Sequence, residues 1–121
     1  MNTLRKASFS EANTSIENMT LYNVDLGGGV LVQKQVSHPG WKWSENVKPI
    51  VGTDSCQKHH VGICVSGHLK LTNIDGSEID VRAGDAYVFE PGHDAWVVGD
   101  EDFVAYEFDA HTAATNAKNE T

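Results

Sequence analysis

Residues 84–96 read Gly84-Asp85-Ala86-Tyr87-Val88-Phe89-Glu90-Pro91-Gly92-His93-Asp94-Ala95-Trp96, a short strand pattern that ends at a Pro-Gly turn and places a histidine directly after it. The run 86–89 has the β-branched and aromatic residues typical of a strand. Pro91 fixes its own φ and Gly92 tolerates positive φ, so His93 is set at a bend. A second strand resumes after it. The segment predicts a hairpin that presents His93 at the mouth of a β-barrel; the alternative is a surface hairpin whose histidine faces water.

The preceding segment, residues 52–67, contains two histidines and two cysteines. Strand alternation puts His60, Gly62 and Cys64 on one face, which we expect to line a cavity. The opposite face, at positions 61, 63 and 65, is predicted to be an aliphatic packing face. Cys64 has the alternative of being a small buried hydrophobic residue.

Short apolar runs separated by turn signals extend along most of the chain, which predicts an all-β sandwich or barrel. Asp75-Gly76 is a hairpin turn, and three glycines at 27–29 form another. We expect residues 1–19 to form an arm or edge strand, residues 20–109 the barrel domain, and residues 110–121 a polar tail. The predicted strands cover residues 21–26, 30–36, 41–47, 60–65, 69–74, 78–82, 86–89, 95–98 and 103–108.

The two segments resemble the sequence motifs of the cupin superfamily, in particular small single-domain cupins of the Cupin_2 type. Similar uncharacterised bacterial cupins share the phrases Trp43-Ser44, Val47-Lys48-Pro49-Ile50 and Pro91-Gly92-His93-Asp94-Ala95-Trp96. The resemblance spans residues 20 to 109 and implies a double-stranded β-helix, also called a jelly-roll barrel. Because small cupins commonly pair, it also implies a homodimer.

The resemblance implies a metal held by both motifs, but this chain departs from the family's ligand set of three histidines and one glutamate. His60 occupies the glutamate's place, Asp54 and Cys56 those of the paired histidines, and Ala95 that of the last histidine. His93 lies two positions earlier. Imidazole and thiolate ligands suit a divalent ion such as zinc, iron, nickel or copper, with manganese also considered. We predict a metal site of Cys56, His60 and His93, which requires a bend at residues 57–59, since a straight strand would separate Cys56 from His60 by about 13 Å.

Composition excludes several other classes of protein. The chain has 121 residues, 17 acidic and 9 basic, giving a formal net charge of −8. Such a field repels nucleic acid, and no apolar run could span a bilayer, so we expect no nucleic-acid or membrane partner. Residues 1–15 lack the charged-then-apolar pattern of a signal sequence, so we expect none. Eight extended residues would separate the two cysteines by about 26 Å, too far for a disulfide. We therefore expect a cytoplasmic protein.

Three functions follow from these residues. The first is binding of a small molecule in a barrel pocket centred on His60 and His93, through a divalent metal or without one, with Trp43, Gly62, Cys64 and Trp96 lining it. The second is metal-dependent isomerase, lyase or dioxygenase chemistry, with the catalytic residues unknown. The third is a structural or assembly role with a filled barrel. The tryptophans have the alternative of being core, and a catalytic Cys56 with His60 as its base is a further alternative.

Overall fold

The fold is known from a computed structural model, which describes residues 3–9 and 14–108. Its elements are β1 (Thr14–Ile16), β2 (Met19–Asp25), β3 (Leu31–Ser37), α1 (Trp43–Asn46), α2 (Lys48–Val51), β4 (His60–Ser66), β5 (His68–Asn73), β6 (Glu78–Arg82), β7 (Ala86–Phe89), β8 (His93–Val97) and β9 (Phe103–Phe108). The all-β prediction is confirmed. The predicted tail lies outside the described residues, and β1 is an edge strand within the predicted arm.

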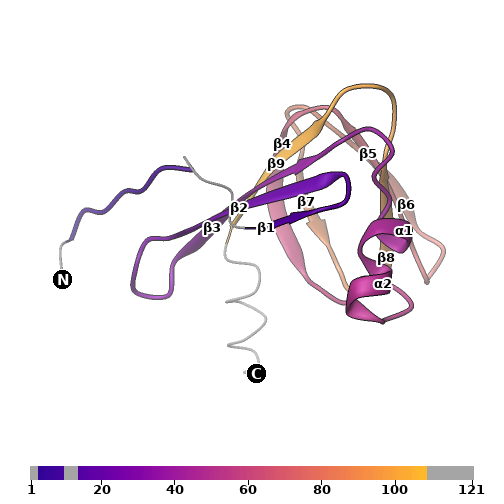
Figure 1. The fold of residues 1–121 in the computed structure, drawn as a ribbon, viewed down its shortest axis with the longest axis horizontal. Helices are drawn as coiled ribbons and strands as arrows, with labels where there is room; N and C mark the ends of the chain where they lie inside the picture. Colours follow the sequence, from indigo (N-terminus) through magenta and orange to yellow (C-terminus); the bar gives the residue numbers. More distant parts are fainter. Residues whose placement is uncertain (1–2, 10–13, 109–121) are drawn as a thin grey trace.

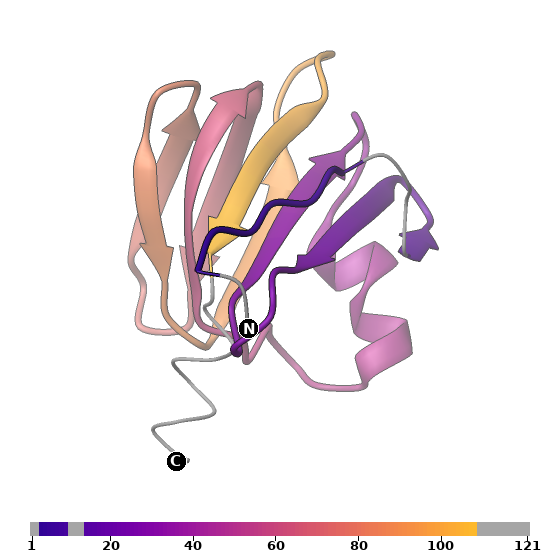
Figure 2. The same cartoon turned by 90° about the vertical axis from the view of Figure 1, so that its left-hand side faces the viewer.

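Two antiparallel sheets enclose the interior of a barrel (Figures 1 and 2). The larger sheet has the strand order β1-β2-β3-β9-β4-β7, and the smaller has the order β6-β5-β8. Every pairing between these strands is antiparallel. The core is built from side chains that point inward from both sheets, among them Leu69 and Val97 of the smaller sheet and Phe103 and Ala105 of the larger. No helix among the described residues is long and apolar enough to cross a membrane.

The segment predicted as a strand over residues 41–47 is instead a loop followed by two single-turn helices. Trp41 and Trp43 are both buried, and this two-residue spacing imitates a strand. The chain then turns, because the Asn46 side chain accepts a hydrogen bond from the Lys42 N–H. Pro49 stands at the start of α2, where a missing N–H costs nothing. The helix ends at Gly52, whose φ of 79° suits glycine.

The alternation of β4 is as predicted, but its aliphatic face does not pack against the core. Val61, Ile63 and Val65 are 39%, 41% and 48% exposed and point away from the barrel, while Gly62 and Cys64 are buried. The polar and small face is inward, where β9 approaches so closely that a Cβ at Gly62 would lie 2.5 Å from the Tyr106 carbonyl oxygen. The prediction of a packing face at these three positions was wrong.

The outward side of the larger sheet carries few charges. By strand register, Ile63 lies beside Ala86 and Tyr106, and Val61 lies beside Val88. Further along, Tyr106 pairs with Lys34, which is the one charged residue among the outward positions of β3, β9, β4 and β7. Residues 3–9 cross in front of β9 and β3 on this side (Figure 2), and Phe9 contacts the ring of Tyr106 with centroids 5.6 Å apart.

Candidate metal centre and cavity

The backbone holds Cys56 beside His93, although 37 positions separate them in the sequence. The Cys56 N–H donates to the His93 carbonyl at 2.8 Å, and the Gly92 N–H donates to the Cys56 carbonyl at 2.7 Å. Gly92 has a φ of 102°, which lets the chain turn sharply after Pro91 before β8 begins at His93. The bend predicted at Pro91-Gly92 therefore places a histidine against the cysteine.

His60 completes the cluster from the first position of β4. Residues 57–59 belong to no strand, so the chain bends between Cys56 and His60, and the Cys56 Sγ lies 3.7 Å from His60 Nε2. One ligand atom from each of Cys56, His60 and His93 lies within 4.8 Å of the other two. Around a tetrahedral zinc ion such atoms stand about 3.3–3.6 Å apart. A small closing movement would thus bring the three side chains to coordination distance.

Both imidazoles have their Nδ1 atoms occupied. His60 Nδ1 donates to the Glu107 carboxylate at 2.7 Å, and His93 Nδ1 donates to the Glu90 carbonyl at 2.7 Å. A carboxylate and a carbonyl only accept, so each Nδ1 carries the proton. The Nε2 atoms are left as the ligand atoms. Hydrogen bonding of the other ring nitrogen is the usual arrangement for metal-binding histidines, so the donor set fits a metal ion.

Glu107, on β9, is a site residue that the sequence analysis missed. It is 7% exposed, and its second carboxylate oxygen accepts a hydrogen bond from Tyr87 Oη at 2.7 Å. The register between β4 and β9 pairs Glu107 with Gly62, two residues from His60. Strand alternation offered a signal, because Glu107 shares the buried face of Phe103 and Ala105.

The side chains of this cluster shift one another's pKa values. Burial alone raises the pKa of the Cys56 thiol, but hydrogen bonds from His60 and His93 lower it to about 6. Burial lowers the pKa of His60, but hydrogen bonds to Cys56 and Glu107 raise it to about 9. Burial and the Glu107 carboxylate raise the pKa of Tyr87, which stays a phenol. The cysteine is therefore a thiolate at neutral pH, paired with a protonated His60 when no metal is bound.

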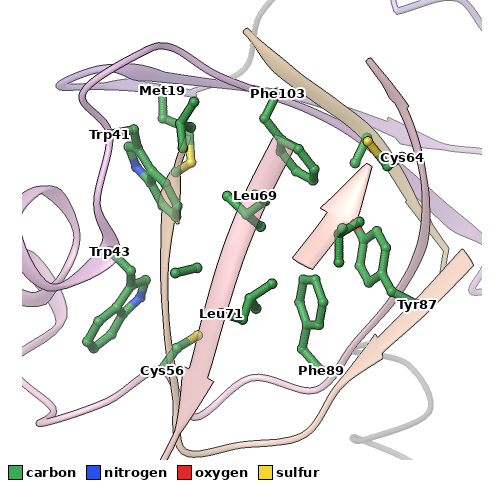
Figure 3. Packing of buried hydrophobic residues seen from close by; sticks show 14 residues of the cluster. Met19, Trp41, Trp43, Cys56, Cys64, Leu69, Leu71, Tyr87, Phe89 and Phe103 are labelled. Carbon is green, nitrogen blue, oxygen red and sulfur yellow. The ribbon is translucent and has the colours of Figure 1, made fainter. Parts of the chain in front are cut away.

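A cavity of about 450 Å³ opens beside the cluster. Figure 3 shows the side chains around it: Cys56 lies near Trp43, and Met19, Trp41 and Phe103 lie farther along the barrel. The other wall residues come from the two helices, the loop before β4 and the facing strands. The lining consists of Ile16, Met19, Leu21, Gln33, Gln35, Trp41, Trp43, Val47, Ile50, Val51, Thr53, Cys56, Gln57, Lys58, His60, Leu69, Phe89, His93, Ala95, Phe103 and Glu107.

Of the four predicted pocket residues, the structure places Trp43 in this lining and the other three elsewhere. Gly62 faces inward, but Tyr87 covers it, since a Cβ there would meet Tyr87 Oη at 2.7 Å. Cys64 is fully buried in the core, as its alternative interpretation held. Trp96 points outward because it lies three positions from His93 on β8, and Lys42 Nζ sits 5.1 Å from its ring.

Other acidic side chains of these segments lie away from the cluster. Asp54, at a family ligand place, is exposed and lies 3.9 Å from Lys48 Nζ. Glu90 is exposed, and its carboxylate lies 3.6 Å from His59, on the outside of the barrel. Glu45 is exposed on α1. These side chains therefore belong to the surface.

Comparison with known proteins agrees with the barrel fold. Residues 52–109 match the family model described as a cupin domain, Cupin_2. No curated protein matches the chain.

Solved structures share the fold at low sequence identity. A structural genomics protein of unknown function from Rhizobium leguminosarum is 17% identical with a TM-score of 0.63, covering 88% of this chain and 97% of its own. A Cupin 2 conserved barrel domain protein from Salinispora arenicola is 18% identical with a TM-score of 0.58, covering 96% and 98%. A double-stranded β-helix protein from Klebsiella pneumoniae is 21% identical with a TM-score of 0.56, covering 88% and 84%. Residues 52–109 therefore match the Cupin_2 model, and the chain shares the double-stranded β-helix fold of these cupin structures.

Proposed function

We propose that this cupin binds a divalent metal ion through Cys56, His60 and His93, and binds a small molecule in the adjacent cavity. The observation that carries the proposal is the convergence of the three ligand atoms within 4.8 Å. Both histidines have Nδ1 hydrogen-bonded elsewhere, so Nε2 is the atom that each offers to the ion, and the pKa of Cys56, about 6, makes it a thiolate at neutral pH. Three protein ligands also leave a coordination position open, as in catalytic rather than structural zinc sites.

The donor set narrows the choice of ion. A thiolate with two imidazoles suits zinc, copper, nickel or iron(II) better than manganese, which prefers oxygen ligands. When bound, such an ion would polarise an oxygen atom of the small molecule. Isomerase, lyase or dioxygenase activity remains the alternative to binding alone. The volume of the cavity argues against the third function, because a barrel filled by its own side chains would leave no space of this size.

The test is metal analysis of protein purified without an affinity tag and reconstituted with zinc. We expect one zinc per chain in the parent and none in a His60→Ala, His93→Ala double variant. His59→Ala is the matched control, since His59 adjoins His60 but faces Glu90 outside the cluster. Replacing zinc with cobalt(II) adds a second readout, because a thiolate ligand gives a charge-transfer band that Cys56→Ser should abolish. Equal zinc in the parent and the double variant would refute the site.

A second candidate function is thiolate chemistry at Cys56 in the metal-free protein. The chain of contacts from Cys56 through His60 to Glu107 has the order of a nucleophile, a base and an orienting carboxylate. Mass spectrometry after iodoacetamide treatment at pH 7 would test it, with the fully buried Cys64 as internal control. Rapid alkylation of Cys56 that zinc does not slow would favour this candidate over the metal site.

A further inference from the structure

We propose that the small molecule is an apolar carboxylate, whose carboxylate group lies at the Cys56–His60–His93 cluster and whose hydrocarbon body fills the barrel. The inference rests on the proposed function, because it places the head of the ligand at the metal's open position. It deepens that function by naming the chemical class of the ligand.

The walls of the cavity require an apolar body. Most lining side chains are hydrocarbon or aromatic, and they surround the space from both sheets and both helices. Figure 3 shows that Met19, Trp41 and Phe103 lie toward the end of the barrel away from Cys56. Ile50 and Val51 of α2 also belong to the lining and are 65% and 53% exposed, so one part of the entrance is apolar as well. The metal cluster therefore lies beside a long apolar surface that no described side chain covers.

The amide and hydroxyl side chains of the lining already donate to other protein groups, and the Trp41 indole N–H is the buried side-chain donor of the described lining that has no partner. Gln35 Nε2 donates to Ser37 Oγ at 2.8 Å, and Gln33 Nε2 donates to Asn23 Oδ1 at 2.8 Å. Nearer the mouth, the Gln57 amide and the Thr53 hydroxyl both donate to the Ser55 carbonyl. A polyhydroxylated ligand would lose its hydrogen bonds to water and find few free donors here. Such a loss is costly in an apolar site.

The charges around the metal cluster favour a ligand with an anionic head group. Glu107 is the one acidic residue of the described lining, and both of its oxygens accept hydrogen bonds from His60 and Tyr87. No free carboxylate is left there to pair with an ammonium group. A divalent ion with a single thiolate ligand keeps a net positive charge, and Lys58 adds a cation at the mouth. A carboxylate is thus attracted to this end of the cavity, and an amine is repelled.

The test uses three six-carbon probes: hexanoate is the reference, and each of the other two differs from it in one main property. Hexanoate has the apolar body and the carboxylate, gluconate has the same carboxylate on a hydroxylated body, and hexylammonium has the same body with opposite charge. Zinc-loaded protein carrying Trp96→Phe would be titrated by tryptophan fluorescence, since Trp41 and Trp43 line the cavity and Trp96 does not. We expect hexanoate to bind at least tenfold more tightly than either other probe. Lengthening it to octanoate should tighten binding about fourfold per methylene group.

Variants separate the cavity from the metal. Ala95→Leu would fill space in the cavity wall, and we expect it to weaken hexanoate at least tenfold while zinc stoichiometry stays at one, which also shows that it folds. Val47→Gln, at a half-buried position of the lining, is a milder second variant that should weaken octanoate more than hexanoate.

The possible failures are distinguishable. If gluconate bound as tightly as hexanoate, the prediction that the ligand has an apolar body would be refuted. If hexylammonium bound more tightly than hexanoate, the prediction that the ligand has an anionic head group would be refuted. Zinc uptake with no binding of hexanoate, octanoate or decanoate would refute the ligand class and leave the metal site standing. Absence of zinc uptake would refute the proposed function. Hexanoate affinity that is the same with and without zinc would refute the placement of the head.

Discussion

Replacing Glu107 with alanine should destabilise the metal-free protein by about 2–6 kcal/mol. The carboxylate accepts two hydrogen bonds, each of 2.7 Å, from His60 Nδ1 and Tyr87 Oη. Alanine leaves two donors without an acceptor, and each unsatisfied buried donor costs about 1–3 kcal/mol. Tyr87 should carry the larger share of this loss, because it is 8% exposed and does not line the cavity, whereas His60 does. The total free energy of unfolding of a domain of this size is about 5–15 kcal/mol, so this loss would leave the variant close to unfolding.

The assay is urea denaturation after treatment with a chelator, followed by tryptophan fluorescence. The chelator matters because a bound ion would stabilise the folded state by mass action. Glu107→Gln keeps the shape and one acceptor, so its loss should be smaller, about 1–2 kcal/mol. Glu101→Ala, at an exposed site, should change the free energy of unfolding by less than about 0.5 kcal/mol. The reasoning is refuted if Glu107→Ala and Glu101→Ala have the same stability.

Three further predictions follow. The pKa of His60, about 9, means that a proton must leave His60 before zinc binds. The affinity for zinc should therefore rise roughly tenfold per pH unit from pH 7 to 9 and then level off. A flat pH profile, measured in competition with a chelator, would contradict this. Gly62→Ala should lower the melting temperature sharply, because its Cβ would lie 2.5 Å from the Tyr106 carbonyl oxygen; an unchanged melting temperature would show that β9 can move. The outward side of the larger sheet carries a single charge on a chain of net charge −8, so two copies could associate through it. In that case Ile63→Lys should convert a dimer to a monomer, as measured by light scattering. A monomeric parent would exclude the dimer.

The turn chemistry and strand alternation predicted most of the fold because both are local. Pro91-Gly92 had to bend the chain, and the alternation of His60, Gly62 and Cys64 had to put them on one face. Alternation does not say which face is inside, however. The barrel interior accepted the polar face of β4, and its valines and isoleucine stayed outside. The face of His60, Gly62 and Cys64 was expected to line a cavity and does lie inward, whereas the aliphatic face was expected to pack and is exposed.

The part of the site that the sequence did not reveal depends on pairing between distant strands. An acid such as Glu107 on a strand is exposed by default, and only the register of β9 against β4 brings it to His60. The outward position of Trp96 could have been predicted, since Trp96 lies three positions after His93 and strand alternation puts the two on opposite faces. The spacing of Trp41 and Trp43 imitated a strand because both rings enter the barrel from a loop that then coils into α1.

Two backbone hydrogen bonds hold Cys56 against the turn at Gly92-His93, and they form when the chain folds. Two of the three proposed metal ligands are already held together by the folded chain, so we expect the protein to fold before it acquires an ion. This is unlike a zinc finger, whose chain is unfolded without its metal. If the proposed site binds an ion, loading would then follow synthesis, and the ion could be exchanged as supply changes. The identity of the ion would then be decided by what is available to a preorganised site, and the same barrel could serve with more than one metal.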